Sequence, residues 1–344
     1  MGERLLLRAL QSGKSRTVTL RGKKLQCIPR TLAKLSMLRV LDLRDNLISR
    51  LGPEFSSLTQ LAVLNLGNNI FREVPEELRY LKSLQILHLF GNKITTISPA
   101  VFDGLDNLIL LNLNNNMLAC LPPQVCRLKN LKFMSLNYNQ LTSIPRELCF
   151  LQKLSELHVL HNQLTALPEE IRFLTNLGKL ILARNQIKEL PDGLCKLRKL
   201  KTLDLAGNQI HIFPAAMQEL QLQELYCEEN PLLQKRPLYA VQTEEVWTLK
   251  EITARFIMDQ LDENDSVLEN SMKYYPEARN MLSHGKVCPV CGKRFLSFWL
   301  ECVNFQTPDQ NMKISKNANS LPIKTLLCSY TCFENRGPGI YGIV

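Results

Sequence analysis

Two close pairs of cysteines near the end of the chain are the residues best suited to chemistry. Cys288 and Cys291 stand in the run Cys-Pro-Val-Cys-Gly, and Cys328 and Cys332 are four positions apart. Proline and glycine permit a tight turn, and two such pairs supply the four thiolates of a tetrahedral zinc site. The spacing therefore predicts a closed, structural zinc site. Cys302, between the two pairs, is a spare thiol or a substitute ligand. The alternative to a zinc site is five unrelated reduced cysteines.

Two neighbouring histidines, His158 and His161, raise the question of catalysis. No cysteine or serine nucleophile with an orienting carboxylate is fixed beside them in the sequence. The chain also contains no glycine-rich phosphate loop and no zinc-protease motif. We therefore expect a protein without enzymatic activity.

A periodic pattern covers most of the chain before the cysteine pairs and includes both histidines. Its frame is Leu-x-x-Leu-x-Leu-x-x-Asn-x-Leu followed by apolar-Pro-x-x-Leu. The asparagines fall at Asn46, Asn69, Asn92, Asn116, Asn139, Asn162, Asn185, Asn208 and Asn230, in steps of 22 to 24 residues. Alternate leucines point the same way from a short strand, and each amide can pair with the backbone of adjoining coils. The pattern is typical of leucine-rich repeats and predicts an α/β solenoid shaped as a horseshoe.

The rest of the chain is organised around this solenoid. We expect an N-terminal capping helix over residues 1–15, about ten leucine-rich repeats of period 23 over 16–232, a linker and helical segment over 233–285, and a zinc-ribbon-like cysteine-pair module over 286–344. A module of this size with few apolar residues needs a staple such as zinc.

The concave strand face of the horseshoe is the expected binding surface. Aromatic and arginine residues carry much of the binding energy of protein interfaces, and the central repeats place aromatic and amide side chains on this face. The predicted contact residues are His88, Phe90, Asn112, Asn114, Ser135, Tyr138, His158, Leu160, His161 and Arg184. The alternative is an ordinary strand face on which these residue types occur by chance.

Residues 243–258 have the spacing of an amphipathic helix, with Thr243 as a candidate N-cap. One interpretation is a cap over the last repeat. The other is an adaptor-binding helix. Its residues Thr248, Leu249, Thr253 and Ile257 resemble the elongin C-binding box of cullin-ligase substrate receptors, although Thr253 stands where cysteine is usual.

Composition limits the partners and the compartment. The formal net charge is +10, but the basic residues are scattered over return segments such as 127–129 and 196–199, which favours a solvated convex face. No apolar run is long enough for a membrane helix, and the eleven cysteines follow no disulfide framework. We expect a monomeric, intracellular and cytoplasmic protein with protein partners, and no membrane or nucleic-acid partner.

The chain as a whole resembles a family of intracellular leucine-rich repeat proteins with a C-terminal cysteine-pair module. The resemblance rests on 146–151, 182–185, 249–253, 299–303 and 328–330. It implies no catalytic activity and a plan of repeats, elongin-box-like helix and cysteine pairs. By analogy, the protein is expected to be a substrate-recognition subunit of an elongin–cullin ubiquitin ligase, with elongin C and a cullin as partners. The alternative is a signalling scaffold that binds a small GTPase or another signalling partner.

Overall fold

The chain forms two compact units. The structure, a computed structural model, describes residues 16–233, 247–262, 266–297, 300–308, 312–314, 320–336 and 341–343. Unit 1 holds the described residues up to Ile210 together with Gln218–Pro231 and one short strand from later in the chain. Unit 2 holds His211–Met217 and the other described residues from Leu232 onward. The predicted capping helix over residues 1–15 and the candidate N-cap Thr243 lie outside the described residues.

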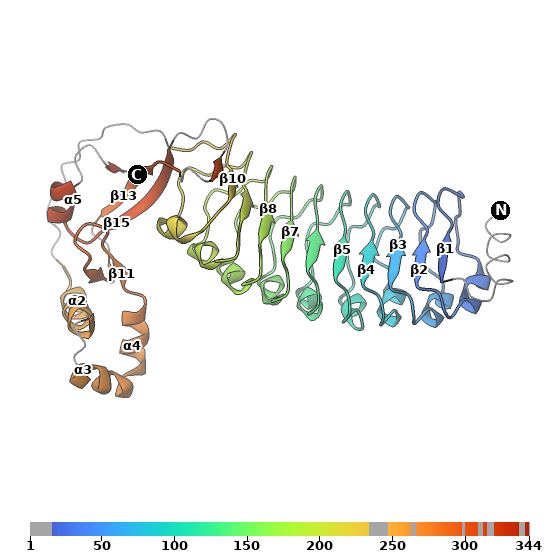
Figure 1. The fold of residues 1–344 in the computed structure, drawn as a ribbon, viewed down its shortest axis with the longest axis horizontal. Coiled ribbons are helices and arrows are strands. Elements are labelled where there is room, and N and C mark those ends of the chain that lie inside the picture. Colours follow the sequence, from blue (N-terminus) through green and yellow to red (C-terminus); the bar gives the residue numbers. More distant parts are fainter. Residues whose placement is uncertain are drawn as a thin grey trace. The chain divides into compact units, whose positions relative to one another are not determined.

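Unit 1 is a solenoid with one strand per coil (Figure 1). Its ten consecutive strands form a parallel sheet in sequence order, and the later strand β14 (Lys313–Ile314) pairs with the last of them. The ten strands are β1 Thr17–Thr19, β2 Val40–Asp42, β3 Val63–Asn65, β4 Ile86–His88, β5 Leu110–Asn112, β6 Phe133–Ser135, β7 Glu156–His158, β8 Lys179–Ile181, β9 Thr202–Asp204 and β10 Glu224–Tyr226. The predicted leucine-rich repeat solenoid is confirmed.

Short 3₁₀ turns return the chain between the strands and stack beside one another on the other side of the coils (Figure 1). They are η1 Arg30–Lys34, η2 Pro53–Ser57, η3 Glu76–Tyr80, η4 Pro99–Phe102, η5 Pro123–Arg127, η6 Arg146–Phe150, η7 Glu169–Phe173, η8 Asp192–Lys196 and η9 Ala215–Glu219. In most of them a proline stands at the N-cap or the first position, where its fixed φ and missing N–H are tolerated.

Leucines in identical register form the core of unit 1. Leu41 pairs with Leu64, Leu64 with Leu87 and Leu87 with Leu111 across neighbouring strands. All four side chains are almost completely buried. Burying each leucine contributes about 1.5–3 kcal/mol, and stacking places every leucine against its counterpart in the next coil.

The repeated asparagines connect the coils in the way their spacing predicts. Asn139 donates from Nδ2 to the carbonyls of Leu113 and Leu136, both at 3.0 Å, and its Oδ1 accepts the N–H of Leu118 at 3.1 Å. The other eight repeat asparagines accept a backbone N–H and donate to two coils in the same manner. Each amide thus satisfies three backbone groups that the turn would leave unpaired.

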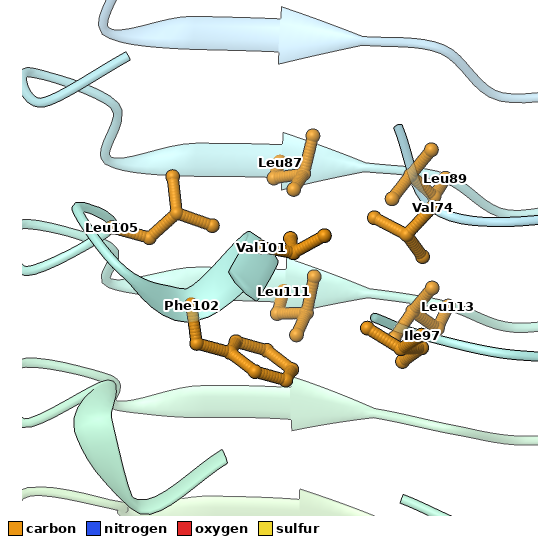
Figure 2. A pocket seen from close by; sticks show the side chains of 9 residues that line it. All are labelled: Val74, Leu87, Leu89, Ile97, Val101, Phe102, Leu105, Leu111 and Leu113. Atoms are coloured by element: carbon orange, nitrogen blue, oxygen red, sulfur yellow. The ribbon is translucent and has the colours of Figure 1, made fainter. Parts of the chain in front are cut away.

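A small apolar pocket lies inside unit 1, beside the repeat that has one extra residue (Figure 2). Its lining is Val74, Leu87, Leu89, Ile97, Val101, Phe102, Leu105, Leu111 and Leu113. Every side chain that lines it is a buried hydrocarbon of the core. With no polar group to orient a ligand, this pocket is a local gap in the packing of a longer coil.

Unit 2 combines helices with two small antiparallel sheets. Its helices are α2 Leu249–Asp262, α3 Ser266–Ser271, the 3₁₀ turn η10 Met272–Tyr274, α4 Pro276–Ser283 and α5 Tyr330–Arg336. Strands β11 (Lys286–Val287) and β12 (Arg294–Phe295) form a hairpin, and β13 (Leu300–Gln306) lies between β15 (Leu321–Leu327) and β16 (Tyr341–Ile343). None of the helices in the described ranges has the length and hydropathy needed to cross a membrane.

Candidate functional site

The four predicted zinc ligands come together in unit 2. The Sγ atoms of Cys288, Cys291, Cys328 and Cys332 all lie within 4.8 Å of one another. The Sγ atom of Cys328 is 3.5 Å from the Sγ atoms of both Cys291 and Cys332. Four sulfurs bound tetrahedrally at about 2.3 Å from one zinc ion would be about 3.8 Å apart. The cluster therefore has the size of a tetrahedral Cys₄ metal site.

The first pair belongs to the turn of the β11–β12 hairpin. Cys288 donates its N–H to the carbonyl of Lys293, and the N–H of Gly292 donates to the carbonyl of Cys288, both at 2.9 Å. Gly292 has φ +75°, a left-handed conformation that a residue with a Cβ adopts at a cost. The glycine after the second cysteine thus lets the chain reverse so that both thiols face the same point.

The second pair lies where strand β15 leads into helix α5. Cys328 directly follows the strand, and Cys332 is in the first turn of the helix. The Oγ of Ser329 accepts the N–H of Cys332 at 3.3 Å and so caps the helix. This cap fixes the orientation of the helical cysteine relative to Cys328.

The electrostatics of Cys288 also suit a metal ligand. Burial of this thiol opposes ionisation, but backbone N–H groups of Cys291, Cys328 and Val290 favour the thiolate and lower the pKa of Cys288 to about 7. A metal binds the thiolate form of cysteine. Cys302, by contrast, lies outside the cluster, and burial raises its pKa to about 12. It is a core thiol rather than a substitute ligand.

A buried ion pair ties helix α2 to the cysteine module. Glu251 accepts Nε–H of Arg255 at 2.6 Å and the backbone N–H groups of Leu296 and Ser297 at 3.1 and 2.8 Å. The guanidinium of Arg255 donates to the carbonyl of Cys328 at 3.0 Å. It also lies 3.9 Å from the centre of the Trp247 ring. Sequence reasoning missed this network, although the four-residue spacing of glutamate and arginine is a helix signal.

Helix α2 differs from its predicted form. It begins at Leu249 rather than near residue 243, and the Oγ1 of Thr248 accepts the N–H of Glu251 at 3.2 Å as the N-cap. The buried face carries Glu251, Ala254 and Met258. The side chains of Leu249, Ile252 and Phe256 instead are 79%, 49% and 63% exposed. The predicted apolar stripe is therefore largely exposed within unit 2.

Two of the four residues of the elongin-box pattern are exposed on the first turns of this helix, and Thr248 is exposed at its N-cap. Thr253 is exposed, and its hydroxyl donates to the carbonyl of Leu249 at 2.8 Å. Ile257 is half-buried and packs against the small core formed by Ala254, Met258 and Leu282. Leu249, the second residue of the pattern, is more exposed than Ile257, the other aliphatic residue of the pattern.

The predicted residues of the strand face all lie in or directly after strands β4–β8. Their rings form pairs. The ring centroids of Tyr138 and His161 are 5.0 Å apart in a stacked arrangement, and those of His88 and Phe90 are 6.2 Å apart and edge-on. Arg184 is exposed and Leu160 is half-buried. These side chains lie on five successive coils.

The predicted amide and hydroxyl groups mainly support this surface. The Oδ1 of Asn112 accepts the N–H of Asn114 at 3.0 Å. The Oδ1 of Asn114 accepts the hydroxyl of Ser135 at 2.7 Å and the N–H of Asn137 at 2.8 Å. Ser135 is buried, with an exposed fraction of 2%, so its hydroxyl is not available to a partner as the sequence predicted.

The two histidines have different surroundings. The Nε2 of His158 lies 3.2 Å from Oε2 of Glu156, and its ring contacts Phe133 edge-on with centroids 5.0 Å apart. Burial lowers the pKa of His158 more than Glu156 raises it, so the neutral form is favoured. His161 is exposed against Tyr138. The two histidines therefore belong to separate ring pairs, His158 with Phe133 and His161 with Tyr138.

Left-handed backbone conformations, which sequence reasoning missed, orient several exposed residues of the strand face. Tyr138, His161 and Arg184 have φ of 57°, 57° and 56°. Each precedes a repeat asparagine, and glycine occupies the same position at Gly91 and Gly207. The recurrence of glycine before the asparagine was the signal that could have revealed this turn.

Comparisons with known proteins agree with this architecture. The family model described as leucine rich repeat matches residues 36–94, 59–118, 82–128 and 175–232. The chain is 54% identical over 131 residues to leucine-rich repeat-containing protein 69 of Mus musculus, and 54% identical over 123 residues to the protein of that name of Homo sapiens. The mouse match covers 38% of each chain and the human match 36% of this chain and 35% of the relative.

Solved structures give the same result for the fold. A leucine-rich repeat protein of Leptospira interrogans matches with a TM-score of 0.61 and 34% identity, over 63% of this chain and 55% of that chain. The ectodomain of the receptor kinase GASSHO1/SCHENGEN3 from Arabidopsis thaliana, solved in complex with CASPARIAN STRIP INTEGRITY FACTOR 2, matches with a TM-score of 0.52 and 30% identity, over 61% of this chain and 27% of that chain.

These matches and the strand face support a protein-binding role, and the four cysteines can hold a metal ion. The repeats, the periodic asparagine ladder and the family match lead to one conclusion. Residues 36–128 and 175–232 contain leucine-rich repeats, and over 131 residues the chain is similar to leucine-rich repeat-containing protein 69 of Mus musculus.

Proposed function

We propose that this protein is a non-catalytic substrate-recognition subunit of an elongin–cullin ubiquitin ligase, in which the strand face of unit 1 selects the client. The observation that carries the proposal is the exposure of Leu249, 79%, on the first turn of helix α2. A helix that presents apolar anchors at a four-residue spacing fits a groove on a partner. Leu249 is such an exposed apolar anchor, Thr253 is exposed four residues later, and Ile257 is half-buried after four more.

The surroundings of the helix support the proposal. Glu251 and Arg255 connect its other face to the cysteine module, so the exposed face is held in one orientation. A preorganised helix loses less conformational entropy on binding than a free peptide. A structural zinc ion at Cys288, Cys291, Cys328 and Cys332 would make this support rigid.

The test is binding of the full chain to purified elongin C, measured by titration calorimetry. Leu249→Ala should weaken binding at least tenfold, because a truncated apolar anchor at an interface costs at least about 1.4–2 kcal/mol. Ile252→Ala is the matched control, since Ile252 is a half-exposed aliphatic residue of the same helix outside the pattern. Absence of binding by the unmodified chain, or an equal loss in both variants, would reject the proposal.

A further inference from the structure

The repeat register gathers positive charge on one edge of unit 1. At this edge the chain passes from each 3₁₀ turn to the next strand. The passage over 127–132 contains three lysines and arginines, the passage over 196–201 contains four, and neither contains an acidic residue. In the sequence these clusters look scattered because about 65 residues separate them. The three-coil offset places them only about 14 Å apart, since neighbouring strands are about 4.8 Å apart.

Several of these cations are available for a partner. Arg127 pairs with Asp103, and Lys196 pairs with Glu219 at 3.3 Å. Lys129, Lys132, Arg198 and Lys201 are exposed, and no described carboxylate forms an ion pair with them. We call the segments 127–132 and 196–201 the basic edge. Charges that are not neutralised within a protein attract a partner of opposite charge.

Two exposed aromatic rings lie between the clusters. Phe150 and Phe173 stand at the positions that Arg127 and Lys196 occupy in the flanking coils, 23 residues apart at each step. Their rings are stacked with centroids 5.6 Å apart, and they are 50% and 39% exposed. An exposed aromatic pair between two clusters of positive charge has the composition of an interface centre.

The rings favour a protein partner over a nucleic acid. A nucleobase stacks on a free aromatic face. The face contacts of Phe173 are already made by Phe150 and by the guanidinium of Arg172, whose central carbon lies 4.9 Å from the ring centre. An aliphatic or aromatic side chain can pack against the exposed parts of the two rings instead.

We propose that the basic edge binds an acidic protein segment, with an apolar side chain against Phe150 and Phe173 and carboxylates at either end. An extended chain rises about 3.3 Å per residue, so about four residues would separate the two acidic groups. This surface differs from the strand face and from helix α2. The proposal is independent of the ligase function.

A labelled peptide tests the proposal directly. The probe has three glutamates at each end and Gly-Leu-Phe-Gly between them, and its affinity for the full chain is measured by fluorescence anisotropy at low and physiological salt. Lys132→Glu with Lys201→Glu should weaken binding at least tenfold. The control variant, Lys93→Glu with Lys188→Glu, makes the same charge change at exposed lysines outside the basic edge. Its affinity for the peptide should stay within twofold of the unmodified chain. Phe150→Ala should weaken binding severalfold.

Two further probes decide between partner classes. A peptide with Gly-Ser in place of the central Leu-Phe should bind several times more weakly, and polyuridylate of similar charge should bind more weakly than the original peptide. Equal binding by the Lys132→Glu, Lys201→Glu variant and the unmodified chain would overturn the proposal. Tighter binding of polyuridylate that these substitutions abolish would also overturn it, because the edge would then be a nucleic-acid surface.

Discussion

Unit 1 and unit 2 reach stability by opposite means. Unit 1 repeats one small device, a leucine stack and an asparagine bridge, so no single coil carries the structure. Unit 2 has small cores around Cys288 and around Met258, and depends on two singular features, the cysteine cluster and the Glu251–Arg255 pair. Substitutions of comparable size should therefore act locally in unit 1 and throughout unit 2.

Metal removal should have the largest effect and should separate the two units. Chelation of the purified protein should remove one zinc ion per chain and unfold unit 2, because binding to a structural site of this kind contributes about 10–16 kcal/mol to folding. Hydrogen exchange measured by mass spectrometry should then show loss of protection in unit 2 and retained protection in β3–β8 of unit 1. Cys288→Ala should reproduce this result.

The matched control for metal removal is Cys302→Ala. This cysteine is equally buried but lies outside the cluster, so the variant should keep stoichiometric zinc. A purified protein without zinc, or a unit 2 that keeps its exchange protection in chelator, would show that the cluster is not a structural metal site.

Loss of the buried Glu251–Arg255 ion pair should have the second-largest effect on stability. Arg255→Met leaves the Glu251 carboxylate in place without its guanidinium partner, and breaking one side of a buried pair costs about 3–5 kcal/mol. We expect faster exchange in α2 and around Ser297, measured against the unmodified chain. Lys250→Met removes a positive charge from the same helix at an exposed position and should change exchange little. Equal effects of the two variants would contradict the assigned role of the pair.

Loss of one repeat asparagine should have a smaller effect that stays within a few coils. Asn139→Ala leaves the carbonyls of Leu113 and Leu136 and the N–H of Leu118 without their partner, at about 1–3 kcal/mol for an unsatisfied buried group. Asn130→Ala is the control, because Asn130 makes an exposed bond to the carbonyl of Asp106. Chemical denaturation should distinguish the two, and equal midpoints would argue against the ladder as a source of stability.

The strand face should tolerate change best. Tyr138→Ala removes one side of an exposed ring pair, and such a pair contributes about 0.5–1.5 kcal/mol. The denaturation midpoint should therefore move less than for Asn139→Ala, while affinity for a client that docks on this face should fall. A larger loss of stability than for Asn139→Ala would mean that Tyr138 is structural.

The periodic parts of the protein could be predicted from sequence because their signal is repeated nine times. The asparagine spacing alone predicted the length of each coil, and the leucine pattern predicted which side of each strand faces the core. The four metal-site cysteines could also be predicted, since two close pairs leave few other arrangements. The exclusion of Cys302 needed the structure, because only strand β13 shows that this thiol points into the core.

Features that depend on single contacts were not predictable in the same way. The sequence left open whether the apolar face of α2 is buried, and it gave no sign that Glu251 is buried through its bonds to Arg255, Leu296 and Ser297, since hydrophobicity alone would place a glutamate outside. The basic edge was missed because charges far apart in sequence become neighbours only when the coils are stacked in register.

The short strand β14 has a consequence for the assembly of whole molecules. It pairs in parallel with β10, and Lys313 lies beside Glu224 on what would otherwise be the open edge of the last coil. An open parallel edge could pair with a strand of another copy. Because β14 lies in the chain between the two cysteine pairs, loss of the metal should also release it. We therefore expect that removal of the metal promotes association between chains through β10.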